Sequence, residues 1–190
     1  MDYFEEKTFE RIDTSIHPFQ KGEYVNCLFK DCNFSDANLS EFKFIECSFL
    51  SCNLSMVKLI KTMLQDIKFT DCKMLGLHFE DCNDFRRSFS FHNCQLNFSS
   101  FYKIKCKSTI FRNCQVHEVD FSECDLTGAL FDNCDLLDAV FDHSILEKTD
   151  FLTSFNFSIN PETNRIKKAK FALSGLPGLL FKYDIIVENI

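Results

Sequence analysis

The stretch 111–151, FRNCQVHEVDFSECDLTGALFDNCDLLDAVFDHSILEKTDF, places an apolar residue at every fifth position. The members of this series are Phe111, Val116, Phe121, Leu126, Phe131, Leu136, Phe141, Leu146 and Phe151. Neither the 3.6-residue period of a helix nor the two-residue period of a strand produces this spacing. A sustained short repeat is typical of a solenoid, whose units bury their apolar residues against neighbouring coils. The stretch therefore predicts an all-β solenoid.

The same period extends outward from this stretch, with one change of register. Upstream, the apolar centres of the five-residue units continue through Phe91, Leu96, Phe101 and Cys106. The first half has its own series: Phe19, Tyr24, Phe29, Phe34, Leu39, Phe44, Phe49, Leu54, Leu59, Leu64, Phe69, Met74 and Phe79. The two series are out of step by two residues, which places a bulge or short kink within 83–88, NDFRRS. Its Arg86 and Arg87 are interpreted either as partner contacts or as solvated charges at the kink.

The cysteines follow the same register. Ten of the eleven stand two residues before a centre, at Cys27, Cys32, Cys47, Cys52, Cys72, Cys82, Cys94, Cys114, Cys124 and Cys134, and Cys106 is itself a centre. Zinc ligands would cluster as CxxC or beside histidine, and the cysteines of this chain show neither arrangement. We interpret them as small buried side chains. Stacked identical side chains point the same way, which is poor geometry for a disulfide, so the sequence predicts free thiols.

The composition fits one packed domain without a bound cofactor. The chain has 190 residues, 24 of them Phe, with only 5 Gly and 3 Pro. No apolar run is long enough to span a membrane, and the acidic N-terminus, MDYFEEKTFERID, does not resemble a secretory signal. A cytoplasmic protein is therefore expected, with no metal, membrane or small-molecule ligand.

Negative charge is concentrated in one segment. The net charge is −7, yet residues 118–150 alone hold ten acidic residues and one basic residue, Lys148. None of the acids occupies a centre or the position two residues before a centre, where the small buried side chains stand, so all are predicted to face water. They are Glu118, Asp120, Glu123, Asp125, Asp132, Asp135, Asp138, Asp142, Glu147 and Asp150. This segment excludes nucleic acid as its ligand and predicts an acidic surface for a protein partner.

Several units resemble one known family closely. CNFSD (32–36), ANLSE (37–41), CNLSM (52–56), CDLTG (124–128) and CDLLD (134–138) are similar to the repeats of pentapeptide repeat proteins. The resemblance implies a right-handed parallel β-helix with a quadrilateral cross-section and twenty residues per coil. Residues 1–157 are then the β-helix, interrupted by the slip at 83–88, and residues 158–190 form a C-terminal cap.

The two ends depart from the repeat. Residues up to Phe19 are expected to form an irregular first coil, and Asn160-Pro161-Glu162 a short helical turn. A helix capped by Ser174 is predicted next, followed by a strand at 185–187. The apolar cap residues are Leu173, Leu176, Leu179, Leu180, Phe181, Tyr183 and Ile185. Two interpretations stay open: the cap only closes its own core, or it also joins two chains in a homodimer, as resemblance to the quinolone-resistance (Qnr-type) branch implies.

The sequence contains no catalytic constellation, so we expect a protein that is not an enzyme. The Qnr-type resemblance implies a DNA mimic that binds a type II topoisomerase, DNA gyrase or topoisomerase IV, and modulates its activity or quinolone sensitivity. Members of that branch project loops from the rod, whereas this chain has only the irregularity at 83–88. The alternative is a structural or adaptor scaffold for another protein, whose acidic zone serves solubility.

Overall fold

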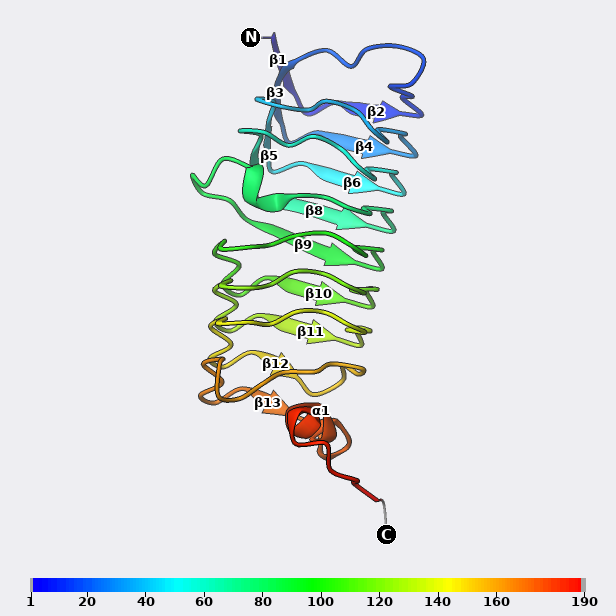
Figure 1. The fold of residues 1–190 in the computed structure, drawn as a ribbon. Helices are drawn as coiled ribbons and strands as arrows, with labels where there is room; N and C mark the ends of the chain where they lie inside the picture. Colours follow the sequence, from blue (N-terminus) through cyan, green and yellow to red (C-terminus); the bar gives the residue numbers. More distant parts are fainter. Residues whose placement is uncertain (1, 189–190) are drawn as a thin grey trace.

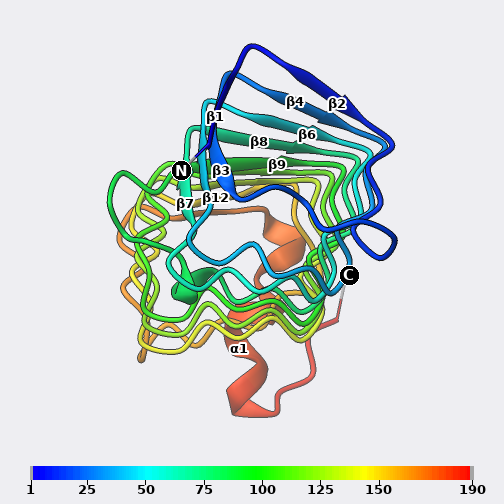
Figure 2. The same ribbon diagram turned by 90° about the horizontal axis from the view of Figure 1, so that it is seen from above.

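The chain winds into a rod of stacked coils, with its N-terminus at one end and a short helix at the other (Figure 1). The computed structural model describes residues 2–188. All strand pairs are parallel, in two sheets with the orders β1-β3-β5-β7 and β13-β12-β11-β10-β9-β8-β6-β4-β2. Figure 2, seen along the rod, shows the coils lying over one another with a gradual rotation from end to end. The predicted solenoid is confirmed.

The strands are short and come at intervals set by the coil. The strands are β1 (Asp2–Glu5), β2 (Thr8–Glu10), β3 (Gly22–Val25), β4 (Leu28–Lys30), β5 (Lys43–Ile45), β6 (Ser48–Leu50), β7 (Met63–Gln65), β8 (Ile67–Thr70), β9 (Phe89–His92), β10 (Ile110–Arg112), β11 (Leu130–Asp132), β12 (Asp150–Phe151) and β13 (Lys170–Phe171). The helical elements are the 3₁₀ turns η1 (Phe79–Asp81), η2 (Leu173–Gly175) and η3 (Phe181–Tyr183), and the helix α1 (Pro177–Leu180).

One coil takes twenty residues, as the resemblance implied. Phe9 pairs with Phe29 between β2 and β4, and Phe111 pairs with Phe131 between β10 and β11. Between β8 and β9, however, Phe69 pairs with Phe91, because the loop before β9 inserts two extra residues. The predicted register slip at 83–88 is confirmed at this point.

The corners of the coil explain the five-residue period. The residue two places after most centres has a left-handed backbone conformation, as at Asp31 (φ 53°) and Asn133 (φ 52°). Such a conformation costs an L-residue on the order of 1–2 kcal/mol and is best tolerated by Gly, Asn and Asp. Hydrogen bonds between coils offset that cost; the Asp31 amide, for example, donates to the Leu50 carbonyl at 2.9 Å.

Stacked aromatic rings fill the second half of the rod. The Phe111 and Phe131 rings lie 4.6 Å apart at an interplanar angle of 2°, and Phe121 and Phe141 stack at 5.1 Å. Rings of the two stacks meet edge to face; Phe121 and Phe131, for example, lie at 88°. This is the arrangement that aromatic quadrupoles prefer. The second half thus holds two phenylalanine stacks that pack against each other along the rod.

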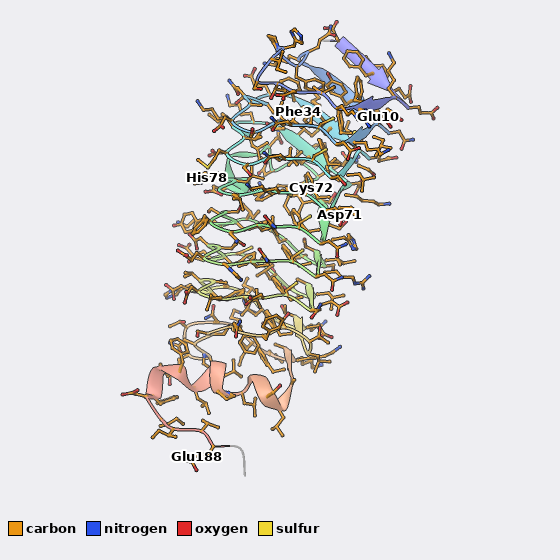
Figure 3. The ribbon with its side chains drawn as sticks, turned by 90° about the vertical axis from the view of Figure 1, so that its right-hand side faces the viewer. Glu10, Phe34, Asp71, Cys72, His78 and Glu188 are labelled. Carbon is orange, nitrogen blue, oxygen red and sulfur yellow. The ribbon has the colours of Figure 1, made fainter. Side chains whose placement is uncertain are left out.

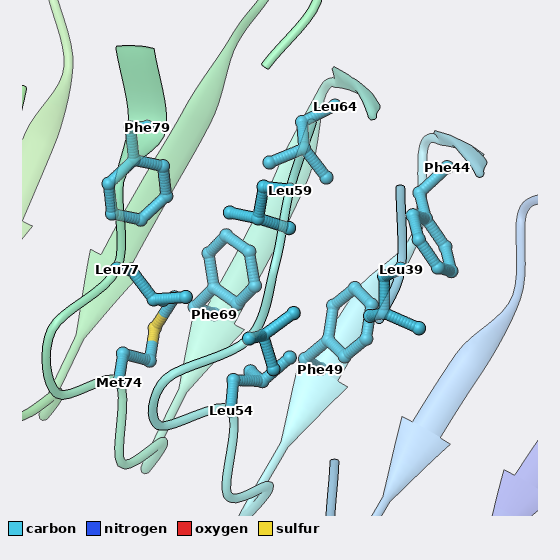
Figure 4. Close-up of a pocket in the computed structure, with 11 residues that line it drawn as sticks. Leu39, Phe44, Phe49, Leu54, Leu59, Leu64, Phe69, Met74, Leu77 and Phe79 are labelled. Carbon is cyan, nitrogen blue, oxygen red and sulfur yellow. The ribbon is translucent and has the colours of Figure 1, made fainter. Parts of the chain in front are cut away.

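The first half of the rod contains a small void. Its coil Leu59, Leu64, Phe69, Met74 has a single aromatic centre, and a void of about 20 Å³ remains in the interior there (Figure 4). The lining is entirely apolar, so a water molecule would find no hydrogen-bond partner inside it. The void remains because leucine and methionine reach less far across the coil than phenylalanine.

All eleven cysteines are free and buried. Six of the thiols donate to a carbonyl group of the preceding coil, as Cys72 does to the Phe49 oxygen at 3.4 Å. Burial raises the pKa of Cys47 to about 12, which keeps that thiol protonated and unreactive at neutral pH. Figure 3 shows Cys72 and Phe34 inside the rod, with Asp71 and His78 on its outside. The prediction of free thiols is confirmed.

Both ends differ from the expectations. β1 and β2 already form regular rungs, with Phe4 stacked on Tyr24 and Phe9 on Phe29, so only the connection from Asp13 to Lys21 is irregular. At the other end, Pro161 begins a short turn, at the place where the sequence predicted one.

The predicted helix of the cap is broken into η2, α1 and η3. Leu176, not Ser174, precedes α1. Pro177 has no N–H to offer and therefore begins a new helical segment. The predicted strand at 185–187 is absent from the described residues, because no neighbouring strand pairs with this segment.

Candidate partner-binding surface

The ten predicted acidic residues are spread around the rod, and none is buried. Glu118, Glu123, Asp138 and Asp142 are exposed, and the other six are half-buried. Their positions relative to the centres distribute them over all four sides of the coil. Position within the five-residue unit therefore did predict which side chains reach water.

Half of these acids form ion pairs with arginine or lysine on an adjacent coil. The pairs are Lys103–Glu123 (3.4 Å), Lys107–Asp125 (3.2 Å), Arg112–Asp132 (2.8 Å), Arg165–Glu147 (2.6 Å) and Lys170–Asp150 (2.8 Å). Two more acids, Asp135 and Asp142, lie 2.8 and 3.0 Å from ring nitrogens of His117 and His143. The bases come from segments before and after 118–150, so neighbouring coils balance much of the charge that the segment carries in sequence.

The remaining three acids have no ion-pair partner within residues 2–188 and share one edge of the rod. Glu118 and Asp138 are twenty residues apart and occupy equivalent left-handed corners. The Glu118 amide donates to the Leu137 carbonyl at 3.0 Å, so the two corners belong to adjacent coils. Asp120 follows Glu118 by two residues and bridges to Val140 in the next coil. We call Glu118, Asp120 and Asp138 the acidic edge.

Apolar side chains adjoin the acidic edge. Phe98 occupies the same corner one coil before Glu118, and its side chain is 58% exposed. Leu137 and Val140, which flank Asp138 and Ala139, are also exposed. A surface that combines exposed aromatic and aliphatic groups with uncompensated charge is typical of a protein–protein contact.

The predicted cap residues divide into two groups. Leu173, Leu176, Phe181, Tyr183 and Ile185 are exposed. Leu179 and Leu180 are half-buried, and Leu179 packs against the hydrophobic core. The cap thus closes the rod with one side and leaves an apolar surface on the other.

The two arginines of the register slip lie in the loop that leaves the rod between η1 and β9 (Figure 1). Arg86 is exposed and Arg87 half-buried. Facing them from the next coil are Lys103 and Lys105, which the sequence analysis did not single out. Alternation of lysine at 103, 105 and 107 in outward positions was the signal that could have found them.

Ion pairing makes the stability of the rod dependent on pH. The Arg112 side chain and the Thr153 hydroxyl both donate to Asp132 and hold its pKa below the usual range. Lys21 does the same for the pKa of Glu41. A carboxylate with a lowered pKa in the folded state stabilises the fold above its unfolded pKa of about 4, and that stabilisation disappears as pH falls through the folded pKa.

We therefore expect the melting temperature to be nearly constant from about pH 8 to pH 5.5 and to fall progressively below about pH 5. Differential scanning calorimetry across this range measures it. Asp132→Asn should melt below the parent at pH 7, and the two melting temperatures should converge as the pH falls toward 2.5, because protonation removes the charge of Asp132. A difference between the two proteins that is the same at both pH values would contradict this origin of the pH dependence.

Two general features of the described residues bear on ligands. No described helix has the length and hydropathy of a membrane span. Within residues 2–188, no three His, Cys, Asp or Glu side chains are grouped so that they could hold a metal ion.

The fold and surface define a parallel β-helix whose interior is filled by its own side chains, so that its chemistry lies on the outside. The chain belongs to the pentapeptide repeat family. Residues 23–89 match the pentapeptide repeat region, and residues 90–128 and 120–151 match the pentapeptide repeats (8 copies). The repeats imply the right-handed quadrilateral β-helix expected from the sequence.

Solved structures of the same fold cover almost the whole chain. Full-length QnrB1, a plasmid-mediated fluoroquinolone resistance protein, is 20% identical, covers 97% of this chain and 100% of its own, and has a TM-score of 0.48. A trypsin-treated QnrB1 variant is 17% identical, covers 98% of this chain and 99% of its own, and has a TM-score of 0.50. HetL from Nostoc sp. strain PCC 7120 is a pentapeptide repeat protein involved in heterocyst differentiation regulation. It is 11% identical, covers 88% of this chain and 84% of its own, and has a TM-score of 0.44. No curated protein matches the sequence.

Proposed function

We propose that this chain is a non-enzymatic binding protein that acts on a type II topoisomerase, DNA gyrase or topoisomerase IV, and modulates its activity or quinolone sensitivity. The observation that carries the proposal is the acidic edge, where Glu118, Asp120 and Asp138 remain uncompensated while the other acids of the segment are paired. The description of QnrB1 as a fluoroquinolone resistance protein makes this class of partner the first to test.

The mode of DNA mimicry that we propose is limited to one side of the rod. Two successive corners with free carboxylates repeat at the spacing of the coils, about 4.8 Å. A positively charged groove that normally holds a DNA backbone would attract such a row of charges. Phe98, Leu137 and Val140 would then add apolar contact beside the charges, which DNA phosphates do not offer.

We further propose that two chains associate end to end through the cap as a homodimer. Leu173, Leu176, Phe181, Ile185 and Ile186 are all exposed at this end of the rod, and Leu173 is 84% exposed. This is a large apolar surface for one short segment, and a two-fold contact would bury it on both copies. Pairing at this end would also bring the two acidic edges toward the middle of the assembly.

The proposal predicts that neutralising the acidic edge abolishes the effect on the topoisomerase. The parent protein should alter gyrase supercoiling, with or without ciprofloxacin, at micromolar concentration, and should co-elute with gyrase at the mass of a dimer. The triple variant Glu118→Gln, Asp120→Asn, Asp138→Asn should bind at least about tenfold more weakly, because rim charges govern association with a charged partner. Size-exclusion chromatography with light scattering measures mass and binding together.

A matched control has the same change of charge at other corners. Glu6, Asp31 and Glu46 are exposed, have left-handed conformations and take part in no ion pair within residues 2–188. Their conversion to Gln, Asn and Gln should leave topoisomerase binding unchanged. Equal weakening by both triple variants would show that only net charge matters, and a parent protein without any effect would refute the topoisomerase proposal.

The second candidate is a scaffold for an unrelated protein. The ion pairs favour it, because they leave less free charge around the rod than a general mimic of DNA would present. A parent dimer that neither binds gyrase nor topoisomerase IV nor changes supercoiling would leave this function standing. The acidic zone would then serve solubility.

A further inference from the structure

The register slip interrupts the hydrogen-bond ladder on one face of the rod. The sheet β1-β3-β5-β7 ends at β7, where the loop 83–88 enters. In later coils of this face, the amide directly before each centre donates to the preceding coil, as Asp125 does to Ile104 at 2.9 Å and Arg165 does to Ser144 at 3.0 Å. Lys105 occupies the equivalent position in the first coil after the slip. Within residues 2–188 its amide has no hydrogen-bond acceptor.

Two adjoining depressions lie where the ladder is interrupted. The first is lined by Asp84, Arg86, Arg87, Lys103 and Lys105. The second shares Arg87 and Lys105 and extends to Lys107 and Ser108. We call them together the basic depression. They arise because the two extra residues push the loop 83–88 outward, so that its side chains face those of the next coil across a gap.

The charges around the basic depression are only partly balanced. Lys103 and Lys107 are paired with Glu123 and Asp125 on the next coil. Arg86, Arg87 and Lys105 form no ion pair within the described part of the chain. Asp84 is the single carboxylate among the lining residues. Positive charge is therefore in excess at this place, although the whole chain carries a net charge of −7.

Arg87 holds unused hydrogen-bond donors at the same place. Its Nη1 donates to the carbonyl oxygens of Phe79 at 3.3 Å and Cys82 at 3.4 Å, which fixes the guanidinium. Its Nε is buried and has no hydrogen-bond partner. A buried N–H without an acceptor costs on the order of 1–3 kcal/mol, and more for a charged group. That atom has almost no exposed surface, so what Arg87 offers to the depression is the positive charge of its fixed guanidinium.

We propose that the basic depression binds a small phosphate-bearing anion. Tetrahedral oxyanions accept several hydrogen bonds at once, and a fixed guanidinium with a free backbone amide is a common cradle for them. The Lys105 amide supplies a directed donor, Arg87 supplies a fixed positive charge, and Arg86 and Lys105 supply mobile positive charge. A compact anion is favoured over a nucleic acid, since the rest of this surface repels a long polyanion.

The inference departs from the sequence, which predicted no small-molecule ligand. The place of a residue within the five-residue unit identifies outward side chains, but it does not show that an insertion opens a gap between two coils. Only the structure brings Arg86 and Arg87 together with lysines sixteen to twenty-one residues later in the chain.

The test is titration of the full-length protein with pyrophosphate and, separately, with inorganic phosphate in a phosphate-free buffer. Calorimetry should give a dissociation constant below about 1 mM for at least one of them, and the Lys105 amide resonance should shift on binding. The double variant Arg86→Gln, Lys105→Gln should bind about tenfold or more weakly, because charge-assisted hydrogen bonds are the strong ones. Both side chains are exposed, so the fold should be unaffected.

The control removes two exposed lysines elsewhere, Lys58→Gln and Lys167→Gln, and should keep the affinity of the parent. Tighter binding of pyrophosphate than phosphate would indicate a diphosphate group as the natural ligand, and the reverse order a monophosphate. No binding of either anion at 10 mM, or equal weakening by both double variants, would overturn the proposal. Tighter binding of a single-stranded oligonucleotide, lost in the Arg86/Lys105 variant, would replace it with a nucleic-acid site.

Discussion

Phe131→Ala should destabilise the rod by about 3–5 kcal/mol, the range for removing a large side chain from a filled core. Phe131 is completely buried, and its ring stacks on Phe111 at 4.6 Å and on Phe151 at 5.0 Å. It also meets Phe121 and Phe141 edge to face. The change therefore opens a cavity and removes both stacking contacts of Phe131 at once, and backbone pairing between coils prevents the walls from collapsing into the space.

Urea denaturation followed by circular dichroism measures this loss. Phe98→Ala is the matched control, because Phe98 is exposed and its removal should change the unfolding free energy by less than about 0.5 kcal/mol. A repeat protein can unfold in parts, so the transition of Phe131→Ala should also broaden or divide near the altered coil. Equal stability of the two variants would show that the aromatic stacks do not hold the rod together.

Gly178→Ala should release the C-terminal cap from the end of the rod. Gly178 lies directly against Phe157: an added Cβ would clash with the Phe157 carbonyl oxygen and stand 2.9 Å from its ring. The Gly178 carbonyl also accepts a hydrogen bond from the Ile159 amide at 2.9 Å. Backbone cannot give way as a flexible side chain can, so we expect a cost of about 1–3 kcal/mol, typical of overpacking, and more for larger residues.

Loss of the cap should be visible in two ways. Hydrogen exchange at the Ile159 amide should accelerate, and the protein should lose the homodimer that we propose, or aggregate through the exposed strand β13. Ser174→Ala is the control, because Ser174 is exposed and its side chain makes no hydrogen bond within the described residues. If Gly178→Ala keeps the exchange rate and the mass of the parent, the close contact with Phe157 does not hold the cap.

Much of the candidate surface could be anticipated and part of it could not. The outward orientation of Asp120 and Asp132 follows from their place in the five-residue unit, as does the slip at 83–88. Their place in the unit does not tell which of the two acids is neutralised. Asp132 meets Arg112 only when the coils stack, whereas Asp120 forms no ion pair within residues 2–188. The cap was the least predictable part: helical spacing suggested one helix, but Pro177 and the contact with Phe157 divide the segment.

The sequence by itself determined the inside and the outside of this protein. A five-residue period, sustained by phenylalanine, leucine and cysteine, leaves no other way to bury the apolar residues, so the coil, its core and its slip follow from local pattern. The tertiary structure alone decided which charges remain free, because pairing depends on residues about twenty positions apart that stacking brings within 4 Å. For the same reason it alone opened the basic depression, where two inserted residues leave the Lys105 amide without the acceptor that its equivalents in later coils have.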